Sequence, residues 1–207
     1  TENTDSDIMY PIMTSEQQNA FDKAFRITFA GDLILLEDQV KRAYTENGYE
    51  FDDVFEYAEK YISSADLAIG VFEGPAAGEE AGYSSSNFDD GKTLWLNFPD
   101  SFANAVQNAG FDLVTTATNH LLDRDISGAS RTLDILDGIG LEHIGSYRTA
   151  EEKQNSRIKL IDCDGLKIAV LAYTYGSNGY DIEELANGHL SYITSIISEL
   201  PANFLKP

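Results

Sequence analysis

The chain has few basic residues, one cysteine and no long apolar run, and each shortage excludes a class of protein. Among 207 residues, 14 Lys and Arg stand against 35 Asp and Glu, which gives a formal net charge of −21. Such a charge repels phosphate backbones and anionic lipid headgroups, so we expect neither nucleic acids nor anionic membrane surfaces as partners. Cations or cationic partners fit the charge better.

Cysteine occurs only at Cys163, so no disulfide can form within the chain. The residue lies in a predicted strand, which favours a small buried side chain over a reactive thiol. No segment approaches the roughly 20 apolar residues that a membrane helix needs, and no charged and then apolar leader is present. We therefore expect the chain as given to be soluble and not transmembrane.

The length and the apolar fraction of 43% predict one large domain with a packed core. Residues 1–24 are polar and acidic without clear periodicity, and we expect a flexible N-terminal arm there. Residues 25–207 then form the folded domain.

Short apolar segments and segments of helical spacing alternate along that domain. Strands are predicted at 25–30, 66–72, 113–118 and 141–145, and helices at 50–65, 99–108, 126–138, 149–155 and 190–200. In the 50–65 helix, the aromatic side chains are expected in the core. Segments 158–162 and 167–175 flank Asp164-Gly165, a hairpin signal. The pattern predicts an α/β fold with a mixed, mainly parallel sheet and one antiparallel pair.

Polar groups follow three predicted strands at the point where each strand ends. Asp32 comes after Gly31, Glu73 precedes Gly74, and Asn119-His120 follows the central strand. Because parallel strands end at one edge of a sheet, these groups should converge. Taken singly, each has a structural alternative as a turn, cap or salt-bridge residue.

Two carboxylates, an amide oxygen and an imidazole together suit a divalent metal ion such as manganese, iron, zinc or magnesium. We therefore predict Asp32, Glu73, Asn119 and His120 as metal ligands. Asp123 lies three residues after His120 and could orient its ring, so this pair is predicted to be catalytic. The metal would polarise a phosphoryl or carbonyl oxygen, or activate a water. Residues 78–96 are predicted to form a flap over this site.

The ordered motifs resemble the bacterial capsule-synthesis, poly-γ-glutamate biosynthesis (CapA-type) family. They span Arg26 to Gly179, and they are Gly31-Asp32, Ala65 to Pro75, Leu96-Asn-Phe-Pro99, Ala109 to Val114, Ala117 to Asp123, and Leu171 to Gly179. The resemblance implies a calcineurin-like metallophosphatase fold, a layered α/β sandwich with a metal site at its strand ends. It also implies that Asp32, Glu73, Asn119 and His120 are site residues, and that Tyr173, Thr174 and Asn178 bind substrate.

The resemblance further implies an extracytoplasmic protein, secreted or membrane-anchored, that works with a membrane-associated capsule synthesis complex. Its function would be capsule or poly-γ-glutamate biosynthesis, as a metal-dependent hydrolase acting on the anionic polymer or on a phosphoester. The alternative is a non-catalytic extracellular module that binds polymer or serves as a scaffold, with a degenerate site that lacks the metal. Bound polymer without turnover would indicate the second.

The sequence departs from the family pattern at three places. Val71-Phe72-Glu73 stands in place of Asn-Leu-Glu, and Arg124-Asp125 stands in place of Tyr-Gly. The later His-Trp-Gly-x-Glu and Gly-His-x-His segments do not occur. We therefore expect the N-terminal part of the full fold, with those later ligands missing.

Overall fold

A central sheet of four parallel strands organises the computed structural model, which describes residues 14–15, 24–163, 165–180 and 188–199. The strand order is β1 (Ile27–Leu33), β4 (Leu67–Phe72), β5 (Leu113–Thr115) and β6 (Glu142–Ile144). Each neighbouring pair is parallel. The predicted α/β fold with a mainly parallel sheet is confirmed, and it is consistent with part of a metallophosphatase-like fold.

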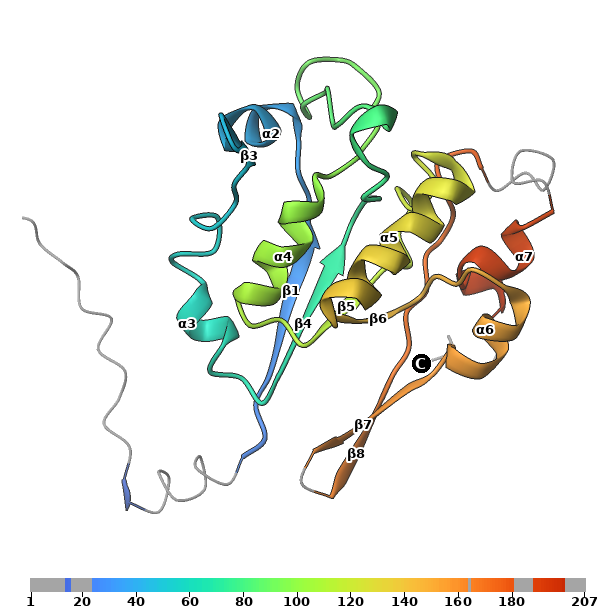
Figure 1. The fold of residues 1–207 in the computed structure, drawn as a ribbon. Helices are drawn as coiled ribbons and strands as arrows, with labels where there is room; N and C mark the ends of the chain where they lie inside the picture. Colours follow the sequence, from blue (N-terminus) through green and yellow to red (C-terminus); the bar gives the residue numbers. More distant parts are fainter. Residues whose placement is uncertain (1–13, 16–23, 164, 181–187, 200–207) are drawn as a thin grey trace, which may run out of the picture.

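Helices connect the parallel strands, and two of them, α4 and α5, lie across one face of the sheet (Figure 1). The helices are α2 (Glu37–Ala43), α3 (Glu59–Ile62), η1 (Glu79–Ala81), α4 (Asp100–Asn108), α5 (Asp125–Ile139), α6 (Ala150–Ser156), α7 (Leu190–Ile193) and η2 (Ile197–Glu199). Pro99, predicted as the first residue of this helix, is the N-cap of α4, one residue earlier; a proline is tolerated there because the first N–H groups of a helix have no helical partner. No helix in the described part of the chain is both long and apolar enough to cross a membrane.

Two antiparallel pairs stand apart from the central sheet. The predicted hairpin is present as β7 (Lys159–Cys163) and β8 (Leu166–Val170), but it forms a two-stranded sheet of its own, so the central sheet is parallel rather than mixed as predicted. It projects away from the sheet in Figure 1. Asp164 of its predicted turn lies outside the described residues. The second pair, β2 (Tyr44–Thr45) and β3 (Gly48–Tyr49), was not predicted.

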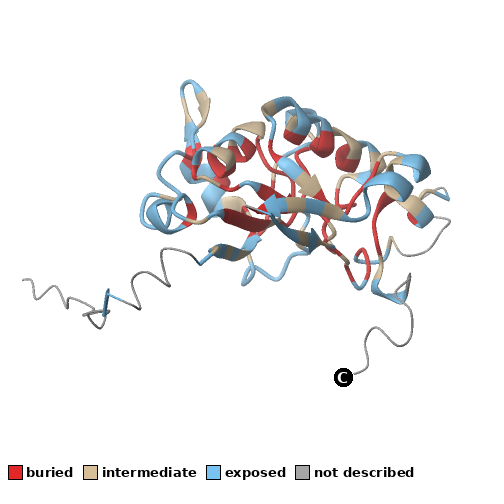
Figure 2. Ribbon diagram, turned by 90° about the horizontal axis from the view of Figure 1, so that it is seen from below, coloured by how far each residue is buried: buried red, intermediate tan, exposed pale blue. Residues whose placement is uncertain are grey.

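The main core lies between the helices and one face of the sheet, where Figure 2 shows the buried residues gathered. Aromatic rings dominate it: Phe98 and Phe102 are edge to face at 5.4 Å, and Phe72 contacts both. The opposite face is covered only in part, by the β7–β8 hairpin. On that face Ile27 and Phe29 of β1 remain 39% and 71% exposed.

The predicted helix over 50–65 is wrong except at its end. Residues 52–58 form successive turns, and only Glu59–Ile62 is helical. Phe51 and Ile62 are buried as expected, whereas Val54 and Tyr61 are 43% and 57% exposed. Asp, Val, Phe and Tyr are weak helix formers. The backbone of this segment therefore follows the packing of Phe51 and Phe55 against Phe102 rather than helical spacing.

The predicted helix over 190–200 is also shorter than expected and stops at Ile193. Thr194 is extended, and its hydroxyl donates to the Gly145 carbonyl at 2.8 Å, which ties the chain to the end of β6. A β-branched residue with an outside hydrogen-bond partner ends the helix there. Leu200 lies outside the described residues, as do residues 1–13 and 16–23 of the predicted arm.

Gly145 is predicted to be essential for packing at the end of β6. Its φ is +116°, and an added Cβ would lie 2.7 Å from Ala117 and 2.9 Å from Ala172. Gly145→Ala should therefore lower the free energy of unfolding by about 2–4 kcal/mol in urea denaturation. Gly138→Ala is the control, because this α5 glycine has open space around it; it should stabilise by about 0.5–1 kcal/mol. Equal changes in the free energy of unfolding for the two variants would contradict the packing role assigned to Gly145.

Candidate functional site

The ends of β4 and β5 are joined by Thr118, and this link positions the candidate site. Glu73 follows β4 directly, and its carbonyl accepts a hydrogen bond from the Thr118 hydroxyl at 3.0 Å. The same hydroxyl accepts from the His120 N–H at 3.2 Å. One threonine side chain therefore fixes the acid at one strand end relative to the histidine beyond the next.

His120 and Asp123 form a buried pair. His120 Nδ1 lies 2.7 Å from Asp123 Oδ2, and the two residues are 9% and 5% exposed. An ionised carboxylate can only accept, so Nδ1 carries the proton and Nε2 is left as the basic nitrogen. Asp123 Oδ2 also accepts from the Leu96 N–H at 2.7 Å. This is the contact that the predicted orienting role of Asp123 requires.

The pKa of the Glu73 carboxyl group is strongly raised. The residue is 8% exposed, and its pKa rises from 4.5 to about 7, chiefly because burial penalises the carboxylate. The Asp32 carboxylate raises this pKa further, and His120 opposes the rise. For His120, burial is the largest effect and lowers the pKa, but the Asp123 hydrogen bond and nearby acids outweigh it, so that pKa is raised.

Asp32 lies close to its predicted position, at the C-terminal end of β1. The sequence placed it just after the strand, and β1 continues through it for one more residue, to Leu33. The strand register shifts between Phe29 and Asp32, so the backbone is irregular just before the acid. Asp32 is exposed, and its charge acts on both Glu73 and His120.

Of the three predicted substrate-binding residues, Asn178 is the one that touches the site. It has a φ of 51°; its Oδ1 accepts from Asn119 Nδ2 at 3.1 Å, and its Nδ2 lies 3.3 Å from His120 Nδ1. Thr174 is buried and donates to the Gly176 carbonyl at 2.9 Å within its own turn, while Tyr173 is half-buried. The substrate-binding roles stay predictions.

The described residues do not by themselves fit a bound metal. No group of three or more His, Cys, Asp and Glu side chains within the described ranges is arranged to hold a metal ion. Asn119, the fourth predicted ligand, donates its Nδ2 to Asn178, and this bond leaves its Oδ1 unused. Asp32 thus affects the pKa values of Glu73 and His120 without the three residues forming a ligand cluster, and the predicted metal-ligand roles stay predictions.

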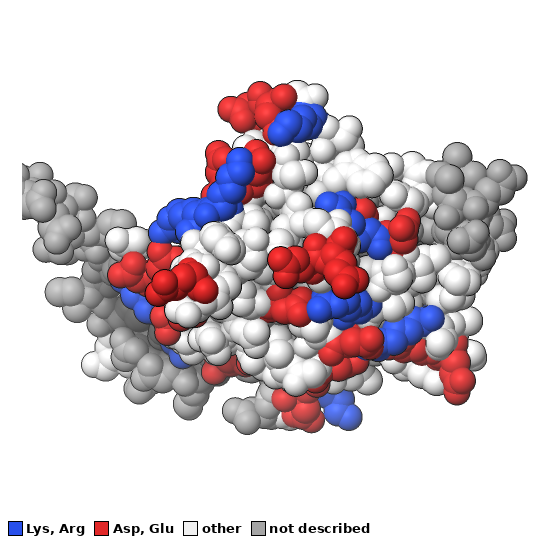
Figure 3. Space-filling model, turned by 45° about the horizontal axis from the view of Figure 1, so that its top comes forward, with Lys and Arg blue, Asp and Glu red and all other residues white. Residues whose placement is uncertain are grey.

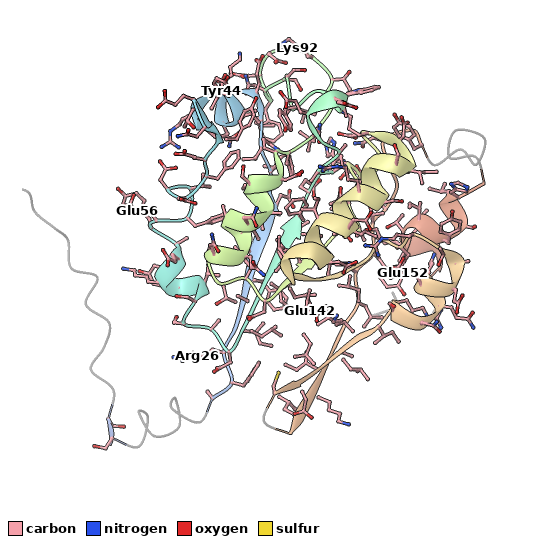
Figure 4. All side chains as sticks on the ribbon, viewed as in Figure 1. Arg26, Tyr44, Glu56, Lys92, Glu142 and Glu152 are labelled. Carbon is pink, nitrogen blue, oxygen red and sulfur yellow. The ribbon has the colours of Figure 1, made fainter. Side chains whose placement is uncertain are left out.

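The segment over 78–96 is irregular apart from η1, as the sequence predicted, and it reaches the top of the molecule at Lys92 (Figure 4). Sequence reasoning missed two side chains that hold it. Buried Asn97 donates to the carbonyls of Gly78 and Gly82. Arg124 donates to those of Ala81, Gly82 and Trp95, and lies 5.8 Å from the Trp95 ring. The only feature of the sequence that pointed to Arg124 was its position directly after Asp123. The predicted flap motion stays a prediction.

Comparison with known proteins shows to which family the chain belongs. The family model described as bacterial capsule synthesis protein PGA_cap matches residues 26–195. The chain belongs to this family. The predicted CapA-type resemblance is confirmed, and the match includes every residue of the candidate site.

Two curated relatives of this PGA_cap chain are similar over most of its length. The capsule biosynthesis protein CapA of Bacillus anthracis is 27% identical over 149 residues, which are 72% of this chain and 34% of that protein. The PGA biosynthesis protein CapA of Bacillus subtilis is 24% identical over 154 residues, 74% of this chain and 38% of that protein. The matched segment thus spans little more than a third of each relative.

Glu73 should make stability depend on pH in metal-free protein. Its folded pKa lies above its unfolded value, so its contribution is fully present below pH about 4.5 and is lost as the pH rises to about 7. Glu73→Gln removes this loss. With a chelator present, the variant should gain roughly 3 kcal/mol over the parent protein between pH 4.5 and 8. Glu151→Gln, at an exposed residue, is the control and should show the same pH dependence of stability as the parent protein. If the stability of Glu73→Gln also followed the parent's pH dependence, the assigned pKa of Glu73 would be contradicted.

Arg124 should hold the 78–96 segment in place. Arg124→Met keeps the apolar stem but removes the donors to three carbonyl groups, so we expect amide exchange over 78–96 to become about tenfold faster. Trp95 is the chain's single tryptophan, so increased acrylamide quenching of its fluorescence reports the same loosening. Arg157→Met, on exposed Arg157, serves as the matched control. Unchanged quenching and exchange in Arg124→Met would show that the segment is held by other contacts.

Proposed function

We propose that the protein carrying this chain acts in capsule biosynthesis as a hydrolase, with His120, Asp123 and Glu73 as its acid–base groups. The observation that carries the proposal is the buried His120–Asp123 hydrogen bond at 2.7 Å, next to an acid at the end of β4. Membership of the capsule synthesis family supplies the biological setting.

The geometry supports a simple division of roles. Asp123 fixes the tautomer of His120 and compensates the positive charge when Nε2 takes a proton from water. The water oxygen then bonds to the carbonyl or phosphoryl centre, and protonated Glu73 gives its proton to the leaving group as that bond breaks. A proton passed from His120 to Glu73 restores both groups. A raised pKa suits Glu73 for this role near neutral pH.

We take the substrate to be the anionic capsule polymer, poly-γ-glutamate, or a small phosphoester formed during its synthesis. One relative is named a capsule biosynthesis protein and the other a PGA biosynthesis protein, and these names support this substrate class. The setting would be extracytoplasmic, in a membrane-associated capsule synthesis complex. A net charge of −21 repels a polyanion, so divalent ions would have to bridge polymer and protein.

A second function is favoured by one observation. Because no metal-ligand cluster forms within the described residues, the chain could bind polymer without cleaving it. In this alternative the protein is an extracellular binding or scaffold module. Cation-dependent binding of intact polymer, with no shortening over time, would separate it from the hydrolase.

The His120–Asp123 pair should be required for hydrolysis. The purified protein is incubated with poly-γ-glutamate or with p-nitrophenyl phosphate, and polymer shortening or nitrophenol release is measured. His120→Gln and Asp123→Asn should each lower the rate about 10²- to 10⁴-fold, the usual contribution of general acid–base catalysis.

The matched control is His143→Gln, because His143 also bonds an aspartate, Asp137, at 3.0 Å but lies on β6 away from the site. It should keep the parent rate. Activity that survives both site substitutions, or that falls equally in the control, would sink the acid–base proposal.

A further inference from the structure

A cavity of about 400 Å³ opens beside Asp32, at the C-terminal end of β1. It lies between the end of β1, helix α2, and the turns at 50–55. In Figure 4 the labelled Tyr44 and Glu56 mark the two segments that flank it. Its lining includes Asp32, Arg42, Glu50, Asp52, Val54 and the rings of Phe51, Phe55 and Phe102. A volume of this size is in the range of small-molecule sites.

The floor of the cavity is apolar and aromatic. Phe51 and Phe102 are buried, with their rings 5.4 Å apart, and Phe55 stacks on Phe102 at 6.3 Å. Of the three rings, half-buried Phe55 is the one with surface to offer a ligand; a ring surface favours an apolar stem and attracts an organic cation.

The charges around the cavity are predominantly negative. Asp32, Glu50, Asp52 and Asp53 all line it, against the single base Arg42. Figure 3 shows acidic groups on this side of the molecule with basic side chains beside them. Arg42 is already bonded to Asp53, so its charge is compensated within the protein. Glu50 Oε1 accepts from the Thr45 hydroxyl at 3.2 Å, which holds that carboxylate at the cavity.

We propose that this cavity is a binding site for a primary ammonium group carried on an apolar stem. The ammonium would lie near Asp32, Glu50 and Asp52, and the stem would lie on the phenylalanine floor. A carboxylate ligand of the same size would meet three acids and no uncompensated base among the lining residues. The proposal does not rest on hydrolysis, because the cavity can bind such a ligand whether or not the site is catalytic.

The test compares three probes of equal size and different charge: benzylammonium, benzyl alcohol and benzoate. Backbone amide chemical shifts of the whole chain are followed at low ionic strength. Benzylammonium should shift amides of 32–35 and 50–55 and bind at least about tenfold more tightly than benzoate, and added salt should weaken it. Equal binding of benzoate, or no binding of benzylammonium, would overturn the proposal.

Variants locate the site. Glu50→Gln keeps the Thr45 acceptor but removes the charge, and Asp52→Asn removes an exposed charge; each should weaken benzylammonium about three- to fivefold. Glu151→Gln carries the same charge change outside the cavity and should have no effect. Val54→Trp, at a residue 43% exposed, should block the mouth without disturbing the core. Binding that persists in Val54→Trp would place the ligand elsewhere and refute the assignment.

Discussion

One carboxylate oxygen connects the parts of this molecule on which the site depends. Asp123 Oδ2 accepts from the His120 ring and from the Leu96 backbone at 2.7 Å each. It therefore fixes the imidazole tautomer and the end of the 78–96 segment at once. Arg124, the next residue, binds carbonyls of the same segment, and α5 begins directly after it. A long irregular segment can stay close to the sheet because its polar backbone is satisfied there.

Burial strengthens these polar contacts and changes the pKa values of the groups that make them. Glu73, His120 and Asp123 are each at most 9% exposed, in a region bordered by aromatic core side chains. Removing water strengthens the attraction between His120 and Asp123, and it also raises the pKa of Glu73. The same environment therefore holds the His120–Asp123 hydrogen bond beside an acid that keeps its proton near neutral pH, a combination suited to proton transfer.

The sequence predicted the parallel strands, and α4 to within one residue, because these depend on local signals, namely buried apolar runs and Pro99. It failed over 50–65, where Phe51 and Phe55 are placed by distant Phe102 rather than by helical spacing. The site followed the same rule. Strand ends indicated Glu73 and His120, but the Leu96 N–H and the Thr118 hydroxyl depend on three-dimensional contacts that no spacing reveals.

Charge restricts how an anionic polymer could approach this surface. Asp32 is exposed between the buried acids and the cavity, so it faces any ligand that reaches either one. The base nearest the site, Arg124, already donates to four carbonyl groups, and Arg42 is paired with Asp53. The charge of Arg42 is therefore compensated, whereas neutral carbonyl groups occupy the N–H donors of Arg124 without cancelling its charge. A polyanion is therefore repelled from this surface unless it brings its own counterions or presents an uncharged or cationic part of itself.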